Sequence, residues 1–306
     1  MKVYPVNYNF SSDSGPNSFT RNLFSNLSGY KDFKLVESPS SADVEFCLIE
    51  SNIRKQSPRI TRLDGIYFNK SQDFNNLNRM IEENYHHSDS VVFQTRFNKS
   101  LIESWFGEHK KSRVIVNRAD LSQIDSIEKA DFSQSFGDSK IWSCASSWRP
   151  HKRLNENIRY FVERSDSNTI LLICGKGVTK EDFSGYENLI NRRVFYLGHL
   201  NWKSLVSVYK SSETFVHLSY LDHCPNVVVD AAASGCNIVC SSSGGTREIS
   251  CLRKKIIHEK DWDFQPIELY SPPKLDFDNF SHESEEIVKT IEDSKIEYYE
   301  EMESVS

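Results

Sequence analysis

The sequence predicts an α/β protein with two domains, each built on a doubly wound parallel sheet. The chain has 306 residues, which suits two domains of about 150 residues each. Short apolar segments alternate with amphipathic segments along most of its length, and glycine turns follow several of the apolar ones. Such alternation is typical of parallel strands joined by helices that cover both faces of the sheet.

The second half of the chain shows this alternation most clearly. Helices are expected at LNENIRYFVER, at WKSLVSVYKSS and at PNVVVDAAASG, which Gly235 closes. Strands are expected at residues 140–146, 168–175, 192–198, 214–219 and 236–242. Ligands of such sheets bind beyond the carboxyl ends of the strands. A site is therefore expected in the turns that follow residues 146, 175, 198, 219 and 243.

In the first half of the chain, a weaker alternation of apolar and amphipathic segments predicts a second α/β unit. Strands are expected at 2–8, 44–50, 59–65, 90–95 and 112–117, and helices at 18–27, 76–88 and 99–107. The polar residues 118–139 are expected to connect the two domains, and the acidic tail is expected to form an amphipathic helix. The predicted boundaries are 1–136 for the first domain, 137–284 for the second and 285–306 for the C-terminal helix.

Composition and charge exclude several classes of function. A net charge of −6 lacks the excess of lysine and arginine that non-specific nucleic-acid binding requires. The short basic runs HKKSR (109–113) and RKK (253–255) are expected to be solvated.

No segment approaches the roughly 20 apolar residues of a membrane span, and the N-terminus lacks the apolar run of a signal peptide. No basic amphipathic helix is evident in the first domain, although peripheral membrane contact stays open.

The seven cysteines are expected to be reduced core thiols, which places the protein in the cytoplasm. Cys236 and Cys240 lack the further ligands of a zinc site. The sequence DWD (261–263) resembles a short metal-binding motif, but an incidental surface turn is the favoured interpretation. No metal site or cofactor is predicted.

The segment SSWRPHKRL (146–154) places basic residues where a strand ends and a helix begins. Arg149, Lys152 and Arg153 lie within this turn. Basic side chains beside a helix N-terminus form an anion-binding site. The alternative is a solvated basic turn.

The segment YLDHCPNVVVDAAASG (220–235) carries two carboxylates eight residues apart. Asp222 precedes a helix that begins near Pro225, and Asp230 lies on its second turn. The amides of this helix end could hold phosphate or sugar oxygens; the residues concerned are His223, Cys224, Pro225, Asn226 and Val227. Asp230 has apolar neighbours, and a buried carboxylate needs partners. Sugar or ribose hydroxyls are candidates, and a basic side chain is the alternative.

Two glycine turns are further candidate ligand-binding segments. SSGGTREI (242–249) joins a strand to a helix, where backbone can approach a ligand closely. SDSGPNSF (12–19) places Gly15 at the first junction between a strand and a helix. This second turn is not GxGxxG, so it does not support a dinucleotide site.

Taken in order, these segments resemble the retaining nucleotide-sugar glycosyltransferases of the GT-B fold, family 4. The resemblance rests on VIVNRAD (114–120), SSWRPHKRL, LLICGKG (171–177), VFYLGHL (194–200), the pair Asp222 and Asp230 in place of two glutamates, and GGTREI. It implies two Rossmann-like domains facing across a cleft. The first would bind the acceptor, the second would bind the nucleotide-sugar donor, and the C-terminal helix would return to the first.

The resemblance also implies roles for the basic and acidic residues of the second domain. Arg149 and Lys152 would neutralise the donor pyrophosphate, with Arg153 as the alternative for Lys152. Asp222 and the amides that follow it would hold the donor sugar and phosphate. Asp230 would bind the ribose hydroxyls.

Further roles are implied elsewhere. Gly15 would approach the diphosphate, and the backbone near Gly175 and His199 would contact the base. Asp64 would replace a family histidine near the reacting sugar carbon. The chain departs from the family where Arg118 replaces a glycine and where aspartates replace both glutamates, which shortens each side chain by roughly one carbon–carbon bond, about 1.5 Å.

The implied function is metal-independent, retaining transfer of a sugar from a nucleotide-diphosphate sugar to a hydroxyl of a glycan or glycoconjugate. A GDP-linked donor is slightly favoured over a UDP-linked one. The alternatives are a catalytically inactive nucleotide-sugar-binding scaffold, or an epimerase or phosphorylase on the same fold. A phosphorylase is disfavoured because no pyridoxal phosphate lysine signature is evident.

Overall fold

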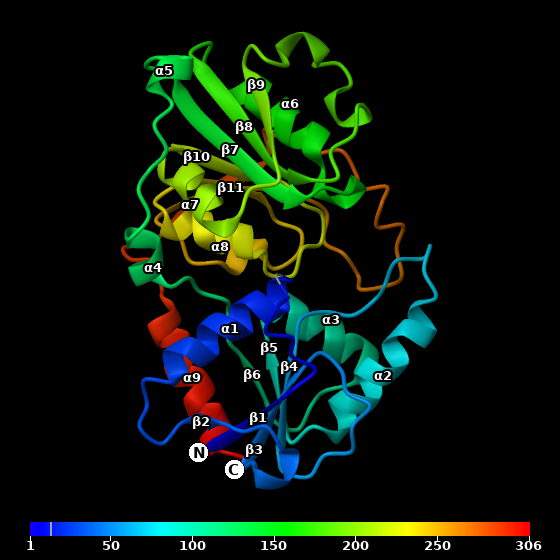
Figure 1. The fold of residues 1–306 in the computed structure, drawn as a ribbon. Coiled ribbons are helices and arrows are strands. Elements are labelled where there is room, and N and C mark those ends of the chain that lie inside the picture. The colour runs from blue at the N-terminus through cyan, green and yellow to red at the C-terminus, as the bar shows by residue number, and fades with distance from the viewer. Residues whose placement is uncertain (13) are drawn as a thin grey trace. The chain divides into compact units, whose positions relative to one another are not determined.

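The computed structural model describes residues 1–12 and 14–306, so Asp13 of the turn at 12–19 lies outside the described residues. The chain divides into two compact units (Figure 1). Unit 1 consists of Met1–Asp120, Asp263–Ile267 and Thr290–Ser306, and unit 2 consists of Leu121–Trp262 and Glu268–Lys289.

Unit 1 is built on a parallel sheet of six strands in the order β2-β1-β3-β4-β5-β6. The strands are β1 (Lys2–Val6), β2 (Lys34–Leu35), β3 (Val44–Leu48), β4 (Arg59–Leu63), β5 (Ser90–Phe93) and β6 (Ser112–Val114). Every residue of β3, β4 and β5 is buried, as expected for central strands of a sheet covered on both faces.

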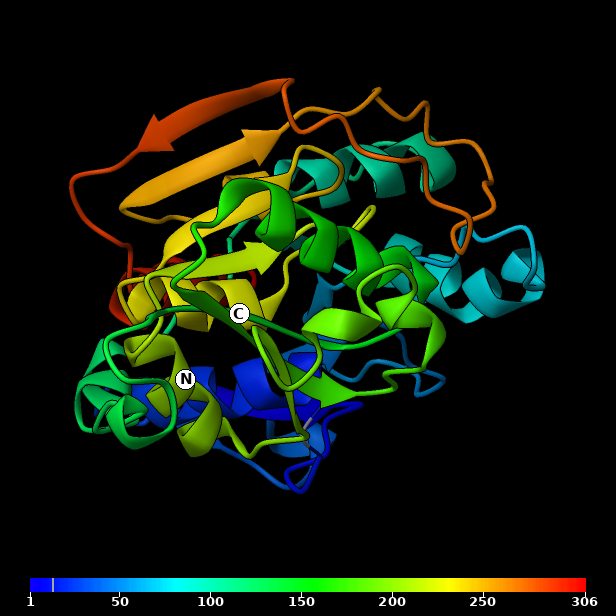
Figure 2. The same ribbon diagram turned by 90° about the horizontal axis from the view of Figure 1, so that it is seen from above.

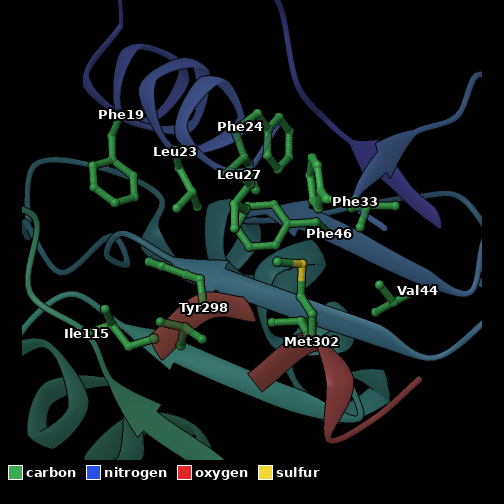
Figure 3. Packing of buried hydrophobic residues seen from close by; sticks show 14 of the residues in the cluster. Phe19, Leu23, Phe24, Leu27, Phe33, Val44, Phe46, Ile115, Tyr298 and Met302 are labelled. Atoms are coloured by element: carbon green, nitrogen blue, oxygen red, sulfur yellow. The ribbon is translucent and has the colours of Figure 1, made fainter. Parts of the chain in front are cut away.

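The helices of unit 1 are α1 (Gly15–Leu27), α2 (Phe74–His87), α3 (Arg96–Phe106) and α9 (Ile291–Glu303), with the 3-10 turn η1 (Pro39–Ser41). The side chains of Asp73 and Thr95 cap α2 and α3 by accepting a hydrogen bond from a first-turn amide, which satisfies a donor that the helix leaves free. Figure 3 shows that α1 and α9 share one apolar core with the sheet. Its residues include Phe19, Leu23, Phe24, Leu27, Phe33, Val44, Phe46, Ile115, Tyr298 and Met302.

Unit 2 is built on a sheet in the order β13-β12-β11-β10-β7-β8-β9, in which only β13 runs antiparallel to its neighbour. The strands are β7 (Lys140–Ser147), β8 (Thr169–Lys176), β9 (Val194–Gly198), β10 (Thr214–His217), β11 (Asn237–Ser241), β12 (Arg253–Ile257) and β13 (Phe280–Ser284). The expected α/β fold with two doubly wound, mainly parallel sheets is confirmed.

The helices of unit 2 are α4 (Leu121–Asp125), α5 (Ser133–Phe136), α6 (Leu154–Arg164), α7 (Trp202–Lys210) and α8 (Asn226–Ala233). Short 3-10 turns lie between them, namely η2 (Pro150–Lys152), η3 (Glu181–Phe183), η4 (Glu187–Leu189) and η5 (Thr246–Glu248). Apolar residues of α6 and β8 form one core, and a second lies between α6, β10, β11 and the segment around Phe277.

The first predicted boundary differs from the division in the structure. Residues 121–136 lie in unit 2, whereas the sequence pattern places them in the first domain. The reason is local contact: the amide of Ala130 donates to the carbonyl of Ser207 at 3.0 Å, and the rings of Phe136 and Phe195 lie 4.7 Å apart.

The chain also returns to unit 1 twice. Asp263–Ile267 belongs to unit 1, where Ile267 pairs with Asn69 and the Trp105 indole donates to the Phe264 carbonyl at 2.8 Å. The C-terminal helix begins at Ile291 rather than at residue 285. A capping box between Thr290 and Asp293 fixes that start.

All seven cysteines are free and buried, as expected. Among residues 1–12 and 14–306, no helix is both long enough and apolar enough to span a membrane. The same residues contain no group of three or more histidine, cysteine, aspartate or glutamate side chains that could hold a metal ion.

Candidate functional site

The strand order of unit 2 places a topological switch between β7 and β10. From β7 the sheet continues to β8 and β9 on one side, and from β10 it continues to β11 and β12 on the other. Loops leaving two such strands diverge and open a crevice at their carboxyl ends, where doubly wound sheets bind ligands. The loops in question follow Ser147 and His217.

The loop after β7 is held in place by its backbone and by Trp148. The buried Trp148 indole donates to the carbonyl of Cys174 at 2.8 Å, and the amide of Tyr220 donates to the carbonyl of His151 at 2.7 Å. The second bond ties this loop to the loop after β10. Burial, assisted by the Lys152 charge, lowers the pKa of His151 to about 4, so its ring is neutral at pH 7.

A cluster of three charged or titratable side chains lies where the two loops meet. Lys152 Nζ is 2.5 Å from Asp222 Oδ2, and His217 Nε2 is 3.0 Å from the same oxygen. The side chains of Lys152 and Asp222 are 17% and 14% exposed, and that of His217 is 3% exposed. Lys152 and Asp222, both predicted to hold the donor, are in direct contact in the structure.

Electrostatics keeps Asp222 ionised. Burial alone would raise the pKa of Asp222, but the Lys152 ammonium and the hydrogen bond from His217 hold it well below its usual range. Burial lowers the pKa of His217, and its bond to Asp222 opposes that shift only in part. Neutral His217 with its proton on Nε2 therefore donates to the carboxylate.

The glycine turn at 242–245 positions Asp222 rather than presenting open backbone. The amide of Gly245 donates to the carbonyl of Asp222 at 2.8 Å. Gly244 has a φ of +82°, and a Cβ atom on it would lie 2.3 Å from that carbonyl oxygen. Only glycine fits this close approach in a left-handed conformation.

Arg149 and Arg153 have different environments although they share one turn. Arg149 is exposed at the start of η2. Arg153 is buried, with Nη1 and Nη2 at 2.9 and 2.6 Å from the two carboxylate oxygens of Glu259. Its guanidinium also lies over the ring of Tyr220. The charge of Arg153 is therefore compensated by Glu259 within the fold.

The N-terminus of α8 follows Asp222 directly. Pro225 is the N-cap residue, and its carbonyl accepts the amides of Val228 and Val229. The amides of Asn226 and Val227 precede those bonds, so they lie at the positive end of the helix dipole. His223 and the buried Cys224 complete the turn, and desolvation lowers the pKa of His223 to about 4.

Among the residues that the structure describes, Asp230 is paired with an indole and not with a basic side chain. Trp202 Nε1 donates to Asp230 Oδ2 at 3.0 Å, and Trp202 is the first residue of α7. Desolvation raises the pKa of Asp230 to about 7, although the bond from Trp202 opposes the shift. Asp230 thus has a second carboxylate oxygen that a ligand hydroxyl could use.

Gly175 and His199 lie at the carboxyl ends of β8 and β9. A Cβ atom on Gly175 would lie 1.8 Å from the carbonyl oxygen of Ser146, so this glycine is required by close strand packing. Its own carbonyl accepts the hydroxyl of Tyr196 at 2.8 Å. His199 is exposed beyond the end of β9.

The predicted residues of unit 1 lie at the carboxyl end of its sheet. Asp64 follows β4, and its Oδ1 is 2.7 Å from Nη1 of the fully buried Arg62. Arg62 Nη2 also donates to Asn117 Oδ1 at 2.9 Å. Burial raises the pKa of Asp64, and the Arg62 charge opposes it. Gly15 is exposed and begins α1.

Sequence reasoning did not identify His217, Trp202 and Glu259. His217 ends a short apolar strand, so a polar residue at that carboxyl end was the available signal. Trp202 and Glu259 gave no signal, because each reaches its partner from a distant segment of the chain.

Comparisons with known proteins concern the family and the fold. Residues 125–263 match the family described as Glycosyl transferases group 1. An uncharacterized glycosyltransferase of Methanocaldococcus jannaschii is 26% identical over 190 residues, which cover 59% of this chain and 46% of the relative. The chain thus spans about half the length of the curated relative that it matches.

Solved structures of low sequence identity share the fold. A glycosyltransferase from Rickettsia africae has a TM-score of 0.63 at 13% identity and covers 100% of this chain and 98% of its own. The Anabaena protein HepE, in complex with UDP and glucose, has a TM-score of 0.61 at 13% identity, with 88% of each chain covered. WaaG, a glycosyltransferase involved in lipopolysaccharide biosynthesis, has a TM-score of 0.62 at 11% identity. The match covers 86% of this chain and 87% of the WaaG chain.

Proposed function

We infer that this chain, a GT-B glycosyltransferase by its fold and by the group 1 domain in its second unit, transfers a sugar from a nucleotide-diphosphate sugar to a hydroxyl of an acceptor. The observation that carries this inference is the contact of Lys152, Asp222 and His217 beside the N-terminus of α8. The cluster combines a cation for phosphate, a carboxylate for hydroxyls and the first-turn amides of α8 at one switch point.

Charge stabilisation of the leaving group is the proposed source of catalysis. As the bond between sugar and phosphate breaks, negative charge grows on the diphosphate. Lys152, the exposed Arg149 and the amides of Asn226 and Val227 would stabilise that charge without reorganising. The electron pair of the broken bond stays on the diphosphate, which takes the proton of the acceptor hydroxyl as the new glycosidic bond forms. Front-face attack would give retention, which the family resemblance supports.

Asp222 is proposed to orient the donor sugar. Its Oδ2 receives both Lys152 and His217, whereas its Oδ1 makes no hydrogen bond to the residues that the structure describes. That oxygen would accept a sugar hydroxyl. Asp230 would accept the ribose hydroxyls in the same way, next to its bond from Trp202.

The remaining site residues keep their proposed roles. The backbone near Gly175 and His199 would contact the base, and Gly15 would approach the diphosphate. Asp64, held by Arg62, would stand in for the family histidine near the reacting carbon. A glycan or glycoconjugate is the proposed acceptor, and side-chain cations are proposed to replace a metal.

The donor can be identified by a ligand screen followed by a turnover assay. A thermal-shift screen of UDP-, GDP-, dTDP- and ADP-sugars finds the donor because bound ligand stabilises the folded state by RT ln(1 + [L]/Kd). The sequence slightly favours a GDP-linked donor, and HepE was crystallised with UDP, so GDP- and UDP-sugars are tested first. Donor hydrolysis or transfer in the presence of EDTA then measures activity.

Substitution of Arg149 decides between an enzyme and an inactive scaffold. Arg149→Ala is expected to reduce turnover strongly, whereas Arg192→Ala removes an exposed arginine before β9 and should leave turnover unchanged. A donor that binds wild-type protein and never turns over would favour the scaffold, and conversion of the donor sugar into its epimer would favour an epimerase. Activity that EDTA abolishes and a divalent cation restores would contradict the metal-independent mechanism.

A further inference from the structure

A pocket of about 520 Å³ opens on unit 2 away from the site described above. Thr214, Asn237 and Arg253 line it, and they are the first residues of β10, β11 and β12. The pocket therefore lies at the amino ends of strands whose carboxyl ends face the Lys152–Asp222 cluster. Its volume is within the range of roughly 300–1,000 Å³ that is typical of small-molecule sites.

The pocket exists because the chain after β12 forms no helix. Within residues 258–279 the structure assigns no helix or strand, and the chain returns as β13, antiparallel to β12 at the edge of the sheet (Figure 2). Leu275 and Phe277 of this segment pack with Val216, Leu218 and Ile257. Those contacts cover the carboxyl half of the strands and leave the amino half open.

Aromatic side chains form one wall of the pocket. Trp142 of β7 and Tyr160 of α6 line it, and their rings stack with centroids 6.2 Å apart. Tyr160 is buried and Trp142 is half-buried. Flat aromatic faces beside hydroxyl and amide groups, such as those of Thr214 and Asn237, suit a ligand with one apolar face and polar edges.

Basic residues also line the pocket. The run RKK at 253–255, which the sequence analysis expects to be solvated, forms part of β12 and lines the pocket. That expectation is wrong for Lys254, which is buried and bonds the carbonyl of Arg247 at 2.5 Å. Its neighbour Glu283, the acidic residue of the lining, lies 3.4 Å from Lys254 Nζ.

Two cations remain for a ligand. Arg253 is exposed and makes no side-chain hydrogen bond or ion pair to the residues that the structure describes. Lys255 Nζ lies 3.7 Å from the ring centroid of Phe280 and 5.5 Å from that of Tyr160. Burial and the Arg164 charge lower the pKa of Lys255, and Asp278 opposes that shift only in part, so a ligand carboxylate would oppose it further. His282 faces Lys255 across the β12–β13 ladder.

We propose that this pocket is a second binding site, which takes an acidic sugar unit of a glycan. The sugar ring would lie against Trp142, and its carboxylate would lie between Arg253 and Lys255. Arginine and lysine bind carboxylates through charge-assisted hydrogen bonds, and local cations on a chain of net charge −6 mark this surface as selective for anions. A nucleotide is the less favoured ligand because the proposed donor site is at the other end of the sheet.

Calorimetric titration of the full chain with trigalacturonate tests the proposal. Maltotriose, which has no carboxylates, and UMP, which has a base and a phosphate, are the comparison ligands. Trigalacturonate is expected to bind and maltotriose is not. Arg253→Gln and Lys255→Gln are each expected to weaken trigalacturonate about tenfold, in the range measured for hydrogen bonds to charged groups. Arg192→Gln, an exposed arginine of the same unit, should leave the affinity unchanged.

The outcomes separate this site from the proposed function. Donor turnover should be unaffected by Arg253→Gln and Lys255→Gln, because neither side chain belongs to the donor site. Equal binding of maltotriose, or unchanged trigalacturonate affinity in both variants, would overturn the proposal. Binding of UMP that weakens equally in both variants would assign the pocket to nucleotides instead.

Discussion

Asp222 receives two hydrogen bonds on one carboxylate oxygen, so Lys152, the proposed ligand for phosphate, also supports the carboxylate. Removing Lys152 or Asp222 leaves the other side chain charged without its counter-ion, although that side chain is only 14–17% exposed. Such a change affects catalysis and stability together, so the two effects have to be measured separately.

Lys152→Met should therefore lower turnover at least about 100-fold, as the loss of a transition-state charge partner does. It should also lower the midpoint of thermal unfolding. Lys129→Met, which removes an exposed lysine of unit 2, should change neither. In the double variant Lys152→Met with Asp222→Asn, part of the stability should return and the activity should not. Full activity in Lys152→Met would remove this residue from the mechanism.

Asp230 should make stability fall as pH rises. Its pKa in the folded protein is about 7, above the value of about 3.9 for an unfolded aspartate. The folded state therefore holds a proton that the unfolded state has lost, and this stabilisation is full below pH 4 and lost as pH rises through 7. The difference in unfolding free energy between Asp230→Asn and wild type, from urea unfolding at pH 5 and pH 8, should increase in favour of the variant at the higher pH. An unchanged difference would show that Asp230 titrates normally.

Much of the candidate site could be predicted at the level of residues, and the failures have physical causes. Lys152, Asp222 and the start of α8 follow from basic and acidic residues at strand ends, which are local features. His217 and Trp202 depend on which strands and helices are neighbours, and spacing along the chain does not encode that. Arg153 looks equivalent to Lys152 in sequence, but its left-handed backbone, with a φ of 53°, accompanies a side chain turned inward to Glu259.

At the level of elements, the turn between β11 and η5 fixes the position of the loop after β10. Gly244 and Gly185 have nearly the same φ, +82° and +84°. A Cβ atom on Gly244 would meet the Asp222 carbonyl at 2.3 Å, whereas one on Gly185 would meet nothing within 4 Å. The pair separates steric contact from backbone strain.

Gly244→Ala should therefore destabilise the protein by about 1–3 kcal/mol more than Gly185→Ala, the usual cost of forcing atoms into packed space. Because the clash is with Asp222, Gly244→Ala should also raise the KM for the donor. Urea unfolding and steady-state kinetics on both variants check the two effects. Equal stability of the two variants would mean that the turn moves freely away from Asp222.

Element prediction succeeded for apolar strands flanked by turns and failed for strands rich in charged or polar residues. The β7, β8 and β10 strands are apolar and flanked by turns, so their pattern was sufficient. The β12 strand begins with three basic residues, and β13 reads FSHES. β13 is the edge strand, where polar side chains reach solvent, and β12 lies between it and β11. The pairing of both strands is visible only in three dimensions.

For the molecule as a whole, unit 1 depends on residues from the end of the chain. Tyr298 and Met302 of α9 are fully buried against α1 and β3. Tyr298→Ala should cost unit 1 about 3–5 kcal/mol, the range for truncating a large buried aromatic side chain. Ile296→Ala, at a position 48% exposed on the same helix, should cost little. If the units unfold separately, calorimetry should show the loss of stability only in the unfolding transition of unit 1. Equal losses of stability in Tyr298→Ala and Ile296→Ala would contradict the packing of α9.

The order in which a ribosome releases this chain has a consequence for how it folds. Unit 2 ends at Lys289, whereas unit 1 ends at Ser306 and begins at Met1. Every residue of the second unit has therefore been synthesised before α9 exists. Residues 1–120 of unit 1 are translated before unit 2, yet unit 1 is complete only after unit 2. The apolar face that α9 covers therefore stays uncovered until residues 291–303 have been synthesised.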